Sequence, residues 1–257
     1  MALSLKVLGC SSATPTSTRN PSAFLLKIDN KREGFLIDCG EGTQILMRKM
    51  GIRMHAISHI FISHLHGDHF LGLVGFIFSQ SLLGRTEELH IYAHKPLEKL
   101  VKMHFKIERA RLSYPLTFHT IKKNYDNKIL FQKDYMEIRC FPLVHGMPTH
   151  GFLFKHPKAS FAYCSDTLYT ETILPYIHGV DLLYHEATFR ENLAQAAAEK
   201  YHATAKEAAK IALKAGAKQL LIGHYSARYN DITPLEEEAK TIFPNTIAAY
   251  EGLTIKF

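Results

Sequence analysis

Three histidines and an aspartate fall within six consecutive positions of one segment, Ser63-His64-Leu65-His66-Gly67-Asp68-His69. The apolar run before it predicts a strand over residues 59–63. Alternate side chains of an extended chain share a face, so His64, His66 and Asp68 should point the same way. Gly67 permits a tight turn, and His69 opens an apolar run that predicts a buried helix over residues 69–83. Imidazoles and carboxylates at this spacing are typical of a metal site, and one such loop can serve two adjacent cations. The alternatives are a histidine-rich surface loop and a single structural zinc, although structural zinc normally relies on cysteine thiolates or wider Cys/His spacing.

Other acidic and imidazole residues stand directly after apolar, strand-like runs elsewhere in the chain. They are Asp38, His145, Asp166, His185, Glu186 and His224. A lone Asp or His after a strand is usually a turn former or a hydrogen-bonded cap. Taken together and beside a histidine-rich loop, these residues are expected to converge if the strand ends share one edge of the fold.

The composition is that of a globular chain with a sizeable core. It has 257 residues and 46% hydrophobic content, enough for one large domain or two small ones. No apolar stretch approaches the roughly 20 residues that cross a bilayer, and the first residues predict a strand rather than a signal peptide, so we expect a soluble cytoplasmic protein. The four cysteines form no Cys-x-x-Cys pair, which indicates reduced thiols and neither a disulfide framework nor a thiolate metal site.

The formal net charge of +7 favours polyanionic partners. A basic stripe recurs every three or four residues on a predicted helix and comprises Lys95, Lys99, Lys102, Lys106 and Arg109. A solvated helix face is the simpler interpretation of this stripe, and a nucleic-acid surface is the alternative.

Strand-like runs and helical patterns are interspersed along the chain, without a long linker or a short repeat. Strands are predicted over residues 3–8, 23–28, 34–37, 59–63, 89–92, 136–144, 151–154, 160–164, 181–184, 219–222 and 246–249. Helices are predicted over residues 42–50, 69–83, 96–112, 204–215 and 234–242. A capping box from Thr204 to Glu207 and Gly216 after the last turn mark both ends of the fourth helix. This pattern predicts a single α/β domain over residues 1–257, with two sheets packed face to face and helices outside.

Several segments together resemble ribonuclease Z, an endonuclease family of the metallo-β-lactamase superfamily. The matching segments are residues 9–15 with Arg19 and Asn20, residues 38–44, 64–69, 185–189 and 224–229. His-x-His-x-Asp-His identifies only the superfamily, whereas His-Glu-Ala-Thr-Phe and His-Tyr-Ser-Ala-Arg-Tyr narrow the likeness to this family. The resemblance implies the metallo-β-lactamase αββα sandwich of two mixed sheets, a metal centre at its edge, and removal of 3′ trailers from transfer RNA precursors.

The resemblance also implies a set of metal ligands. One zinc would be bound by His64, His66 and His145, the other by Asp68, His69 and His224, and Asp166 would bridge the two. Such a pair lowers the pKa of a shared water and neutralises charge on both the attacking and the leaving oxygen of a phosphodiester. Manganese and iron accept the same ligand types, so the sequence leaves the metal open.

Other roles follow from the same resemblance. Asp68 would also act as the general base, and His202, oriented by Glu186, would protonate the leaving oxygen. Arg228 would clamp a phosphate, and Asp38 would support the metal loop without binding metal. The family resemblance further implies a homodimer formed through helices near the metal loop.

One feature of the family is missing from this chain. The usual bacterial members carry a long basic arm that grips transfer RNA, placed between the residues that match His145 and Asp166. Here these residues are separated by 166 − 145 = 21 positions, which leaves no room for the arm. The family's Ser-Gly-Asp-Thr is also changed, to Cys164-Ser165-Asp166-Thr167. Phosphodiester hydrolysis and the choice of substrate are therefore separate questions.

Three hypotheses follow. The first is a dinuclear zinc endoribonuclease that acts on transfer RNA precursors or another structured RNA. The second is a small-molecule hydrolase on the same fold, such as a cyclic-nucleotide phosphodiesterase, an esterase or a sulfatase. The third is an RNA-binding protein with an inactive site, which the complete set of ligand positions disfavours.

Overall fold

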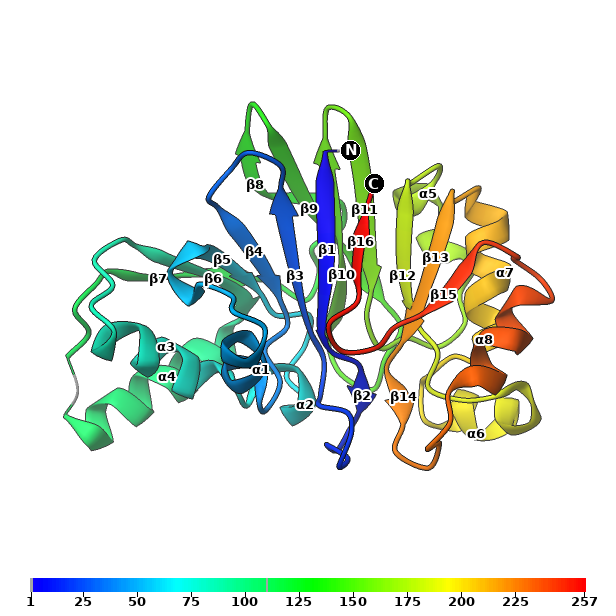
Figure 1. Cartoon of the computed structure of the whole chain (residues 1–257), viewed down its shortest axis with the longest axis horizontal. Coiled ribbons are helices and arrows are strands. Elements are labelled where there is room, and N and C mark those ends of the chain that lie inside the picture. Colours follow the sequence, from blue (N-terminus) through cyan, green and yellow to red (C-terminus); the bar gives the residue numbers. More distant parts are fainter. Residues whose placement is uncertain (1, 110) are drawn as a thin grey trace.

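The computed structural model describes residues 2–109 and 111–257, and it consists of two seven-stranded sheets that face each other (Figure 1). The first sheet has the order β16-β1-β3-β4-β5-β6-β7, and the second has the order β15-β13-β12-β11-β10-β9-β8. The strands of the first sheet are β1 (Leu3–Gly9), β3 (Ala23–Ile28), β4 (Gly34–Ile37), β5 (Ile57–Phe61), β6 (Leu89–His94), β7 (Leu116–Ile121) and β16 (Thr254–Lys256). Those of the second are β8 (Lys128–Lys133), β9 (Met136–Leu143), β10 (Thr149–His156), β11 (Ala159–Cys164), β12 (Leu182–Glu186), β13 (Gln219–Gly223) and β15 (Thr246–Ala248). A third pairing joins two short strands, β2 (Ser11–Ser12) and β14 (Tyr225–Ser226).

Each sheet is mixed. Strands β4 to β7 run parallel, whereas β16, β1, β3 and β4 pair antiparallel. In the second sheet β8 to β11 pair antiparallel, and β11, β12, β13 and β15 run parallel. Because β9 and β11 are both antiparallel to β10, the carboxyl ends of β9, β11, β12 and β13 all lie at one edge of the sheet.

Helices cover the outer faces of the two sheets, as the αββα prediction required (Figure 1). The helices beside the first sheet are α1 (Thr43–Lys49), α2 (Gly67–Phe70), α3 (Leu73–Leu82) and α4 (Lys95–Glu108). Those beside the second are α5 (Leu174–Ile177), α6 (Ala194–Glu199), α7 (Ala205–Ala215) and α8 (Thr233–Lys240). None of the helices in the described part of the chain combines the length and the apolar character that a membrane span requires.

The alternation of side chains along β3 shows why two cores form. Phe24 points between the sheets, where its ring lies 4.5 Å from that of Tyr184. Leu25, the next residue, points outward and joins the cluster under the helices with Met47 and Phe76. The first sheet is therefore covered on both faces at β3 and β4, which explains why these two strands are apolar almost throughout.

Two predicted elements around the metal loop were wrong in detail. The strand predicted over residues 59–63 ends at Phe61, and the helix predicted over residues 69–83 is broken into α2 and α3. Gly72 lies at the break, where its N–H bonds to the Cys39 carbonyl at 2.9 Å and a Cβ atom would come within 2.1 Å of the Gly40 oxygen. His64 and His66 lie in the connecting loop, so the expectation that Asp68 shares their face of a strand is also wrong.

The other predicted helices and strands are present, with ends shifted by a few residues. Strands β7, β8 and β16 were not predicted, nor were β2 and β14. Helix α4 ends at Glu108, before the predicted end, and Arg109 after it takes a left-handed conformation (φ 51°). Ala110, inside the predicted helix, and Met1, inside the predicted domain, lie outside the described residues.

Candidate active site

Most of the residues singled out as candidate site residues follow the carboxyl ends of β4, β5, β9, β11 and β13. These strand ends point toward the lower part of Figure 1. The first sheet supplies Asp38 directly after β4 and the histidine-rich loop after β5. The second supplies His145, Asp166 and His224, each within two residues of the end of β9, β11 or β13. The seam between the two sheets is thus where the polar side chains meet.

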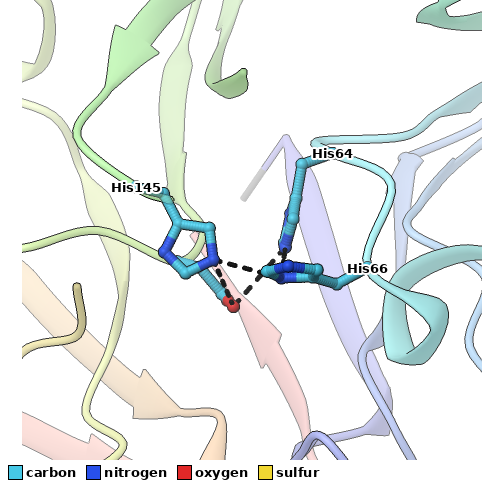
Figure 2. Close-up of side chains that lie close together, drawn as sticks. His64, His66 and His145 are labelled. Carbon is cyan, nitrogen blue, oxygen red and sulfur yellow. Dashed lines mark hydrogen bonds and ion pairs between the residues drawn. The ribbon is translucent and has the colours of Figure 1, made fainter. Parts of the chain in front are cut away.

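Four of these residues form a first group: His64, His66, His145 and Asp166. Figure 2 shows the three imidazoles converging. The Nδ1 atom of His66 lies 3.1 Å from Nε2 of His64 and 3.1 Å from Nε2 of His145, and Asp166 Oδ2 lies 3.5 Å from His64 Nε2. Ligands about 2.1 Å from a tetrahedral cation lie about 3.4 Å from one another, so these separations suit a bound metal.

Asp68, His69 and His224 form a second group next to the first. The Nε2 atom of His224 lies 3.2 Å from Asp68 Oδ2 and 3.3 Å from His69 Nε2. Asp166 contacts this group through its other oxygen, since Oδ1 lies 3.3 Å from His224 Nε2 and 3.4 Å from His69 Nε2. One carboxylate therefore stands between two sets of ligand atoms.

The chemistry of Asp166 and His69 fits a cation. Asp166 Oδ1 is buried and has no hydrogen-bond partner among the described residues, an arrangement that is costly unless a positive charge lies beside it. Burial lowers the pKa of His69, but the carboxylates of Asp166, Asp38 and Asp68 raise it well above its ordinary value. The surroundings thus favour a positive charge at this point, which a metal ion can supply in place of a proton.

His64 is prepared to be a ligand. Burial lowers its pKa to about 4, so the imidazole is neutral at pH 7 and keeps a lone pair for a metal. His145 donates from Nδ1 to the Tyr201 carbonyl at 2.9 Å, which leaves its Nε2 facing the first group. These bonds select the ring nitrogen that each histidine presents.

Asp38 supports the second group from behind and is not a member of either group. Its Oδ2 accepts hydrogen bonds from His69 Nδ1 (2.8 Å), Tyr163 Oη (2.7 Å) and Ser63 Oγ (3.0 Å), and its Oδ1 accepts one from the Ser63 amide (2.8 Å). The bond to Nδ1 turns Nε2 of His69 toward the other ligand atoms. Asp38 (φ 55°) and His224 (φ 61°) both adopt the left-handed backbone conformation, which costs energy for a residue with a Cβ atom.

Glu186 is fully buried and organises a second set of bonds. Its Oε1 accepts from His202 Nδ1 (2.8 Å) and the Ala203 amide (3.1 Å), and its Oε2 accepts from the Thr188 hydroxyl (2.7 Å). Thr188 in turn lies 3.0 Å from His224 Nδ1, so the same carboxylate helps to orient a residue of the second group.

His202 bonds Glu186 through Nδ1, and within the described part of the chain its Nε2 has no hydrogen-bond partner. Burial lowers its pKa, but the Glu186 carboxylate raises it to about 9, so the imidazole carries a proton at pH 7. His202 also lines a cleft of about 390 Å³ together with Asp68, Asp166 and His224. A phosphodiester in this cleft would meet both the metal ligands and a protonated imidazole.

The structure separates His185 and Arg228 from this cluster. His185 is buried, donates from Nδ1 to the Glu186 carbonyl at 2.7 Å, and belongs to neither group. Arg228 is exposed and does not line the cleft. Its guanidinium lies 5.0 Å from the centre of the Phe189 ring, and its Nε donates to Ser226 Oγ. The role of Arg228 as a phosphate clamp stays a prediction.

Several residues of the site were missed by sequence reasoning. The Ala13 amide donates to Asp68 Oδ2 at 2.8 Å, and Ser12 and Ala13 line the cleft. Thr188 and Tyr163 bond Glu186 and Asp38 respectively. Ser12, Ala13 and Thr188 lie in segments that carried the family resemblance, but no role was predicted for them. A buried Tyr on a strand gave no signal of its own.

Comparisons with known proteins found similar proteins over most or all of the chain. The Beta-lactamase superfamily domain matches residues 34–225. The chain is 38% identical to proteins named Ribonuclease Z from Bacteroides fragilis, over 98% of each chain, and from Porphyromonas gingivalis, over 99% of each. Among solved structures, the short form of human tRNase Z (ELAC1) is 26% identical over 98% of both chains with a TM-score of 0.86. The metallo-beta-lactamase fold protein YhfI from Bacillus subtilis is 21% identical over 98% of both chains with a TM-score of 0.82, a likeness of fold alone.

The comparison with the bacterial relatives also contains a difference in length. The match to the Bacteroides fragilis protein runs over 300 positions, at least 43 more than the 257 residues of this chain. Between His145 and Asp166 the structure has only a short turn and the hairpin of β10 and β11. The extra residues of the relative have no counterpart here.

Proposed function

This chain belongs to the ribonuclease Z family of the β-lactamase superfamily, and from that membership we propose that it is a metal-dependent endoribonuclease that removes 3′ trailers from transfer RNA precursors. The observation that carries the proposal is the pair of ligand groups joined by Asp166, set in a cleft that His202 also lines. Water would attack the phosphorus, and the P–O bond to the 3′ oxygen would break. The products are transfer RNA with a 3′ hydroxyl and a trailer with a 5′ phosphate.

The proposed ligands are those expected from the family resemblance. His64, His66 and His145 would hold one cation, Asp68, His69 and His224 the other, and Asp166 would contact both. A bound pair of cations would supply an activated water and offset negative charge on the phosphate. Zinc suits these nitrogen and oxygen donors, as do manganese and iron, and we propose zinc in the cell.

Two proton transfers are assigned to residues of the chain. Asp68, whose Oδ2 accepts from the Ala13 amide, is proposed as the general base for the attacking water. His202, with Nδ1 bonded to Glu186, is proposed to donate from Nε2 to the leaving 3′ oxygen. Glu186 keeps His202 protonated and orients its ring. Asp38 orients the ring of His69 through the bond to Nδ1.

Cleavage of a precursor tests this function directly. The metal-loaded protein should cut a labelled transfer RNA precursor next to the discriminator base, and rising salt should weaken the reaction as phosphate contacts are screened. The variant His66→Ala should lower the rate at least about 100-fold. Absence of any cut by protein with both cations bound would reject the proposal.

A second candidate, a phosphodiesterase for cyclic nucleotides or other small substrates, is favoured by one observation. At least 43 aligned positions of the bacterial relative have no counterpart in this chain, and only a short turn and a hairpin lie between His145 and Asp166, where the resemblance places the arm for transfer RNA. Fast hydrolysis of a cyclic nucleotide together with negligible cleavage of the precursor would identify this activity. Arg228, if it clamps a phosphate, would serve either substrate.

We further propose a homodimer and a cytoplasmic location. Large apolar side chains are exposed on and beside α1 and α3, the helices near the metal loop in sequence: Ile45 (56%), Leu71 (60%), Leu82 (86%) and Leu83 (49%). Exposed apolar groups gathered in this way mark an interaction surface. Sedimentation should give twice the monomer mass of 29.2 kDa, and Leu82→Lys should shift the protein toward the monomer. The proposal of a cytoplasmic location depends on the proposed substrate, a transfer RNA precursor.

A further inference from the structure

A second hollow lies beside the metal loop and is not used by the proposed reaction. It has a volume of about 360 Å³, and its wall includes Leu65, Pro96, Met147 and Pro148. Three lysines stand at the same hollow: Lys95, Lys122 and Lys123. We call it the lysine pocket.

The lysine pocket shares a wall with the proposed metal site. Leu65 lies between His64 and His66, and Met147 comes two residues after His145. The two loops therefore carry proposed ligands on one side and apolar pocket wall on the other. A chain molecule whose phosphate lay at the metals would have a neighbouring unit within reach of this pocket.

The charge of the pocket comes chiefly from Lys122 and Lys123, which directly follow β7. Both are exposed, and within the described residues neither has a carboxylate partner. Lys95, at the start of α4, instead bonds Glu98 at 2.5 Å, and Lys102 bonds the same residue at 2.6 Å. The two free ammonium groups are thus available to an anion, and the basic stripe of α4 starts at the same place.

The floor of the pocket offers apolar surface rather than free polar groups. His94 also lines it, but its Nε2 lies 3.3 Å from His150 Nδ1, and the other nitrogen of His150 bonds the Tyr125 carbonyl. An apolar floor with a cationic rim matches a nucleotide, whose base has flat apolar faces and whose phosphates are negative. Recognition by contact without hydrogen bonds is tolerant of base identity.

We propose that the lysine pocket binds one unpaired nucleotide of the RNA substrate next to the scissile phosphate, with its base on Leu65, Met147 and Pro148 and its phosphate on Lys122 and Lys123. The inference rests on the proposed function. It assigns part of substrate binding to the turn over Gly146–Pro148, which in this chain stands in the interval where the resemblance places the arm.

Steady-state kinetics with two substrates tests the proposal. The double variant Lys122→Ala, Lys123→Ala should raise KM for a transfer RNA precursor about tenfold. It should leave kcat/KM for bis(p-nitrophenyl) phosphate, which has no nucleotide to fill the pocket, within about twofold of the wild type. The matched control is Lys155→Ala, Lys158→Ala, which removes the same number of charges. These lysines lie at the end of β10 that is opposite the Met147 and Pro148 wall of the pocket, roughly 20–25 Å from that wall by strand length. Equal KM values for the two double variants overturn the proposal.

Precursors with an abasic site test the base contact without altering the protein. One abasic position near the cut should raise KM about tenfold in the wild type and less than about threefold in the Lys122→Ala, Lys123→Ala variant. Changing the base at that position should alter KM less than about twofold. Equal sensitivity to every abasic position would exclude a pocket for one nucleotide.

Failure of the proposed function gives a different result. Wild-type protein that hydrolyses bis(p-nitrophenyl) phosphate but cuts no precursor rejects the endonuclease. The pocket is then measured alone, through the Kd of a fluorescent tetranucleotide with phosphorothioate linkages, which the lysine variant should raise about tenfold. An unchanged Kd overturns the pocket. Binding of a fluorescent fatty acid but not of the tetranucleotide would overturn it in favour of an apolar anion.

Discussion

Asp38 controls the candidate site without facing the cleft, because its two oxygens accept four hydrogen bonds from three residues around it. The carboxylate is wholly buried, so each of these bonds replaces water that the group has lost. Its bond to His69 fixes which nitrogen of that ring faces the ligand cluster. Asp38 does not line the cleft, yet it sets the orientation of His69, a proposed metal ligand.

Replacement of Asp38 should therefore reduce both stability and metal binding. Asp38→Ala should lower the free energy of unfolding by about 3 kcal/mol, since buried donors of Ser63, Tyr163 and His69 lose their acceptor. Asp38→Asn should cost less, because asparagine keeps an acceptor oxygen and tolerates the left-handed backbone. Urea unfolding and metal analysis of both variants measure the effects. A loss below about 1 kcal/mol for the alanine variant would contradict this account.

The proposed acid role of His202 predicts a dependence on the leaving group. A 3′ ribose oxygen needs a proton as it leaves, whereas p-nitrophenolate is stable without one. His202→Ala should thus lower precursor cleavage about 100- to 1,000-fold and hydrolysis of bis(p-nitrophenyl) phosphate less than about tenfold. Parallel loss on both substrates would instead indicate a structural or metal-binding role.

At this scale the sequence singled out the members of both side-chain groups and, through the family resemblance, Asp38 and Glu186 behind them, but it did not reveal Tyr163 or Thr188. His64, His66, Asp68 and His69 stand out because their types and spacing are unusual in one loop. Tyr163 is indistinguishable from any buried aromatic residue of a strand until the fold brings it to Asp38. Orientation depends on contacts between distant segments, and a single sequence does not display these.

Secondary-structure elements with local signals were predictable, and those set by close tertiary contact were not. The capping box of α7 and Gly216 at its end were read from the sequence and are present, with Gly216 at φ 64°. The break between α2 and α3 was missed, since Gly72 interrupts an otherwise helical run only because Gly40 lies against it. Strand β8 was missed because most of its side chains are exposed and give no apolar alternation.

The capping box makes α7 a test of local stabilisation. The Thr204 hydroxyl accepts from the Glu207 amide at 3.2 Å, and Glu207 Oε2 accepts from the Thr204 amide at 2.8 Å. Thr204→Ala should cost about 1 kcal/mol and lower Tm by about 2–4 °C, as expected for a chain of this size. Thr204→Ser keeps the hydroxyl and is the matched control. Equal Tm values for the two variants would show that the cap contributes nothing.

In the molecule as a whole, polar side chains connect the two sheets at both ends of the sandwich. The candidate metal cluster lies at the carboxyl end of β4, and Glu33 lies just before the other end. Glu33 bonds His59 of its own sheet at 3.1 Å, and it also bonds Lys133, the last residue of β8, and Tyr135 in the turn between β8 and β9. The core shared by both sheets supports the proposal that the chain forms one domain.

Glu33 should make stability depend on pH. Burial raises its pKa, but hydrogen bonds from His59 and Tyr135 outweigh this and lower it to about 2 from an ordinary 4.5. A carboxylate with a lowered pKa stabilises the fold above pH about 4.5, and the effect is lost as pH falls toward 2. Glu33→Gln should cost about 1 kcal/mol at pH 7, allowing for partial exposure, and progressively less from pH 4.5 downward.

Urea unfolding of both proteins between pH 7 and pH 3 measures this difference, with Glu41→Gln as an exposed control. A gap between wild type and Glu33→Gln that stays constant or widens with acid would have the wrong sign.

The two sheets are connected by the candidate metal groups at one end and by the bonds of Glu33 at the other. A chelator should therefore increase local unfolding at the first end only. Amide hydrogens around Asp38 and the start of β10 should exchange with deuterium faster once the cations are withdrawn. Those beside Glu33 and Tyr135 should keep their original protection. The two sheets would then separate at the edge that carries the candidate metal groups and stay packed together at the edge that carries Glu33.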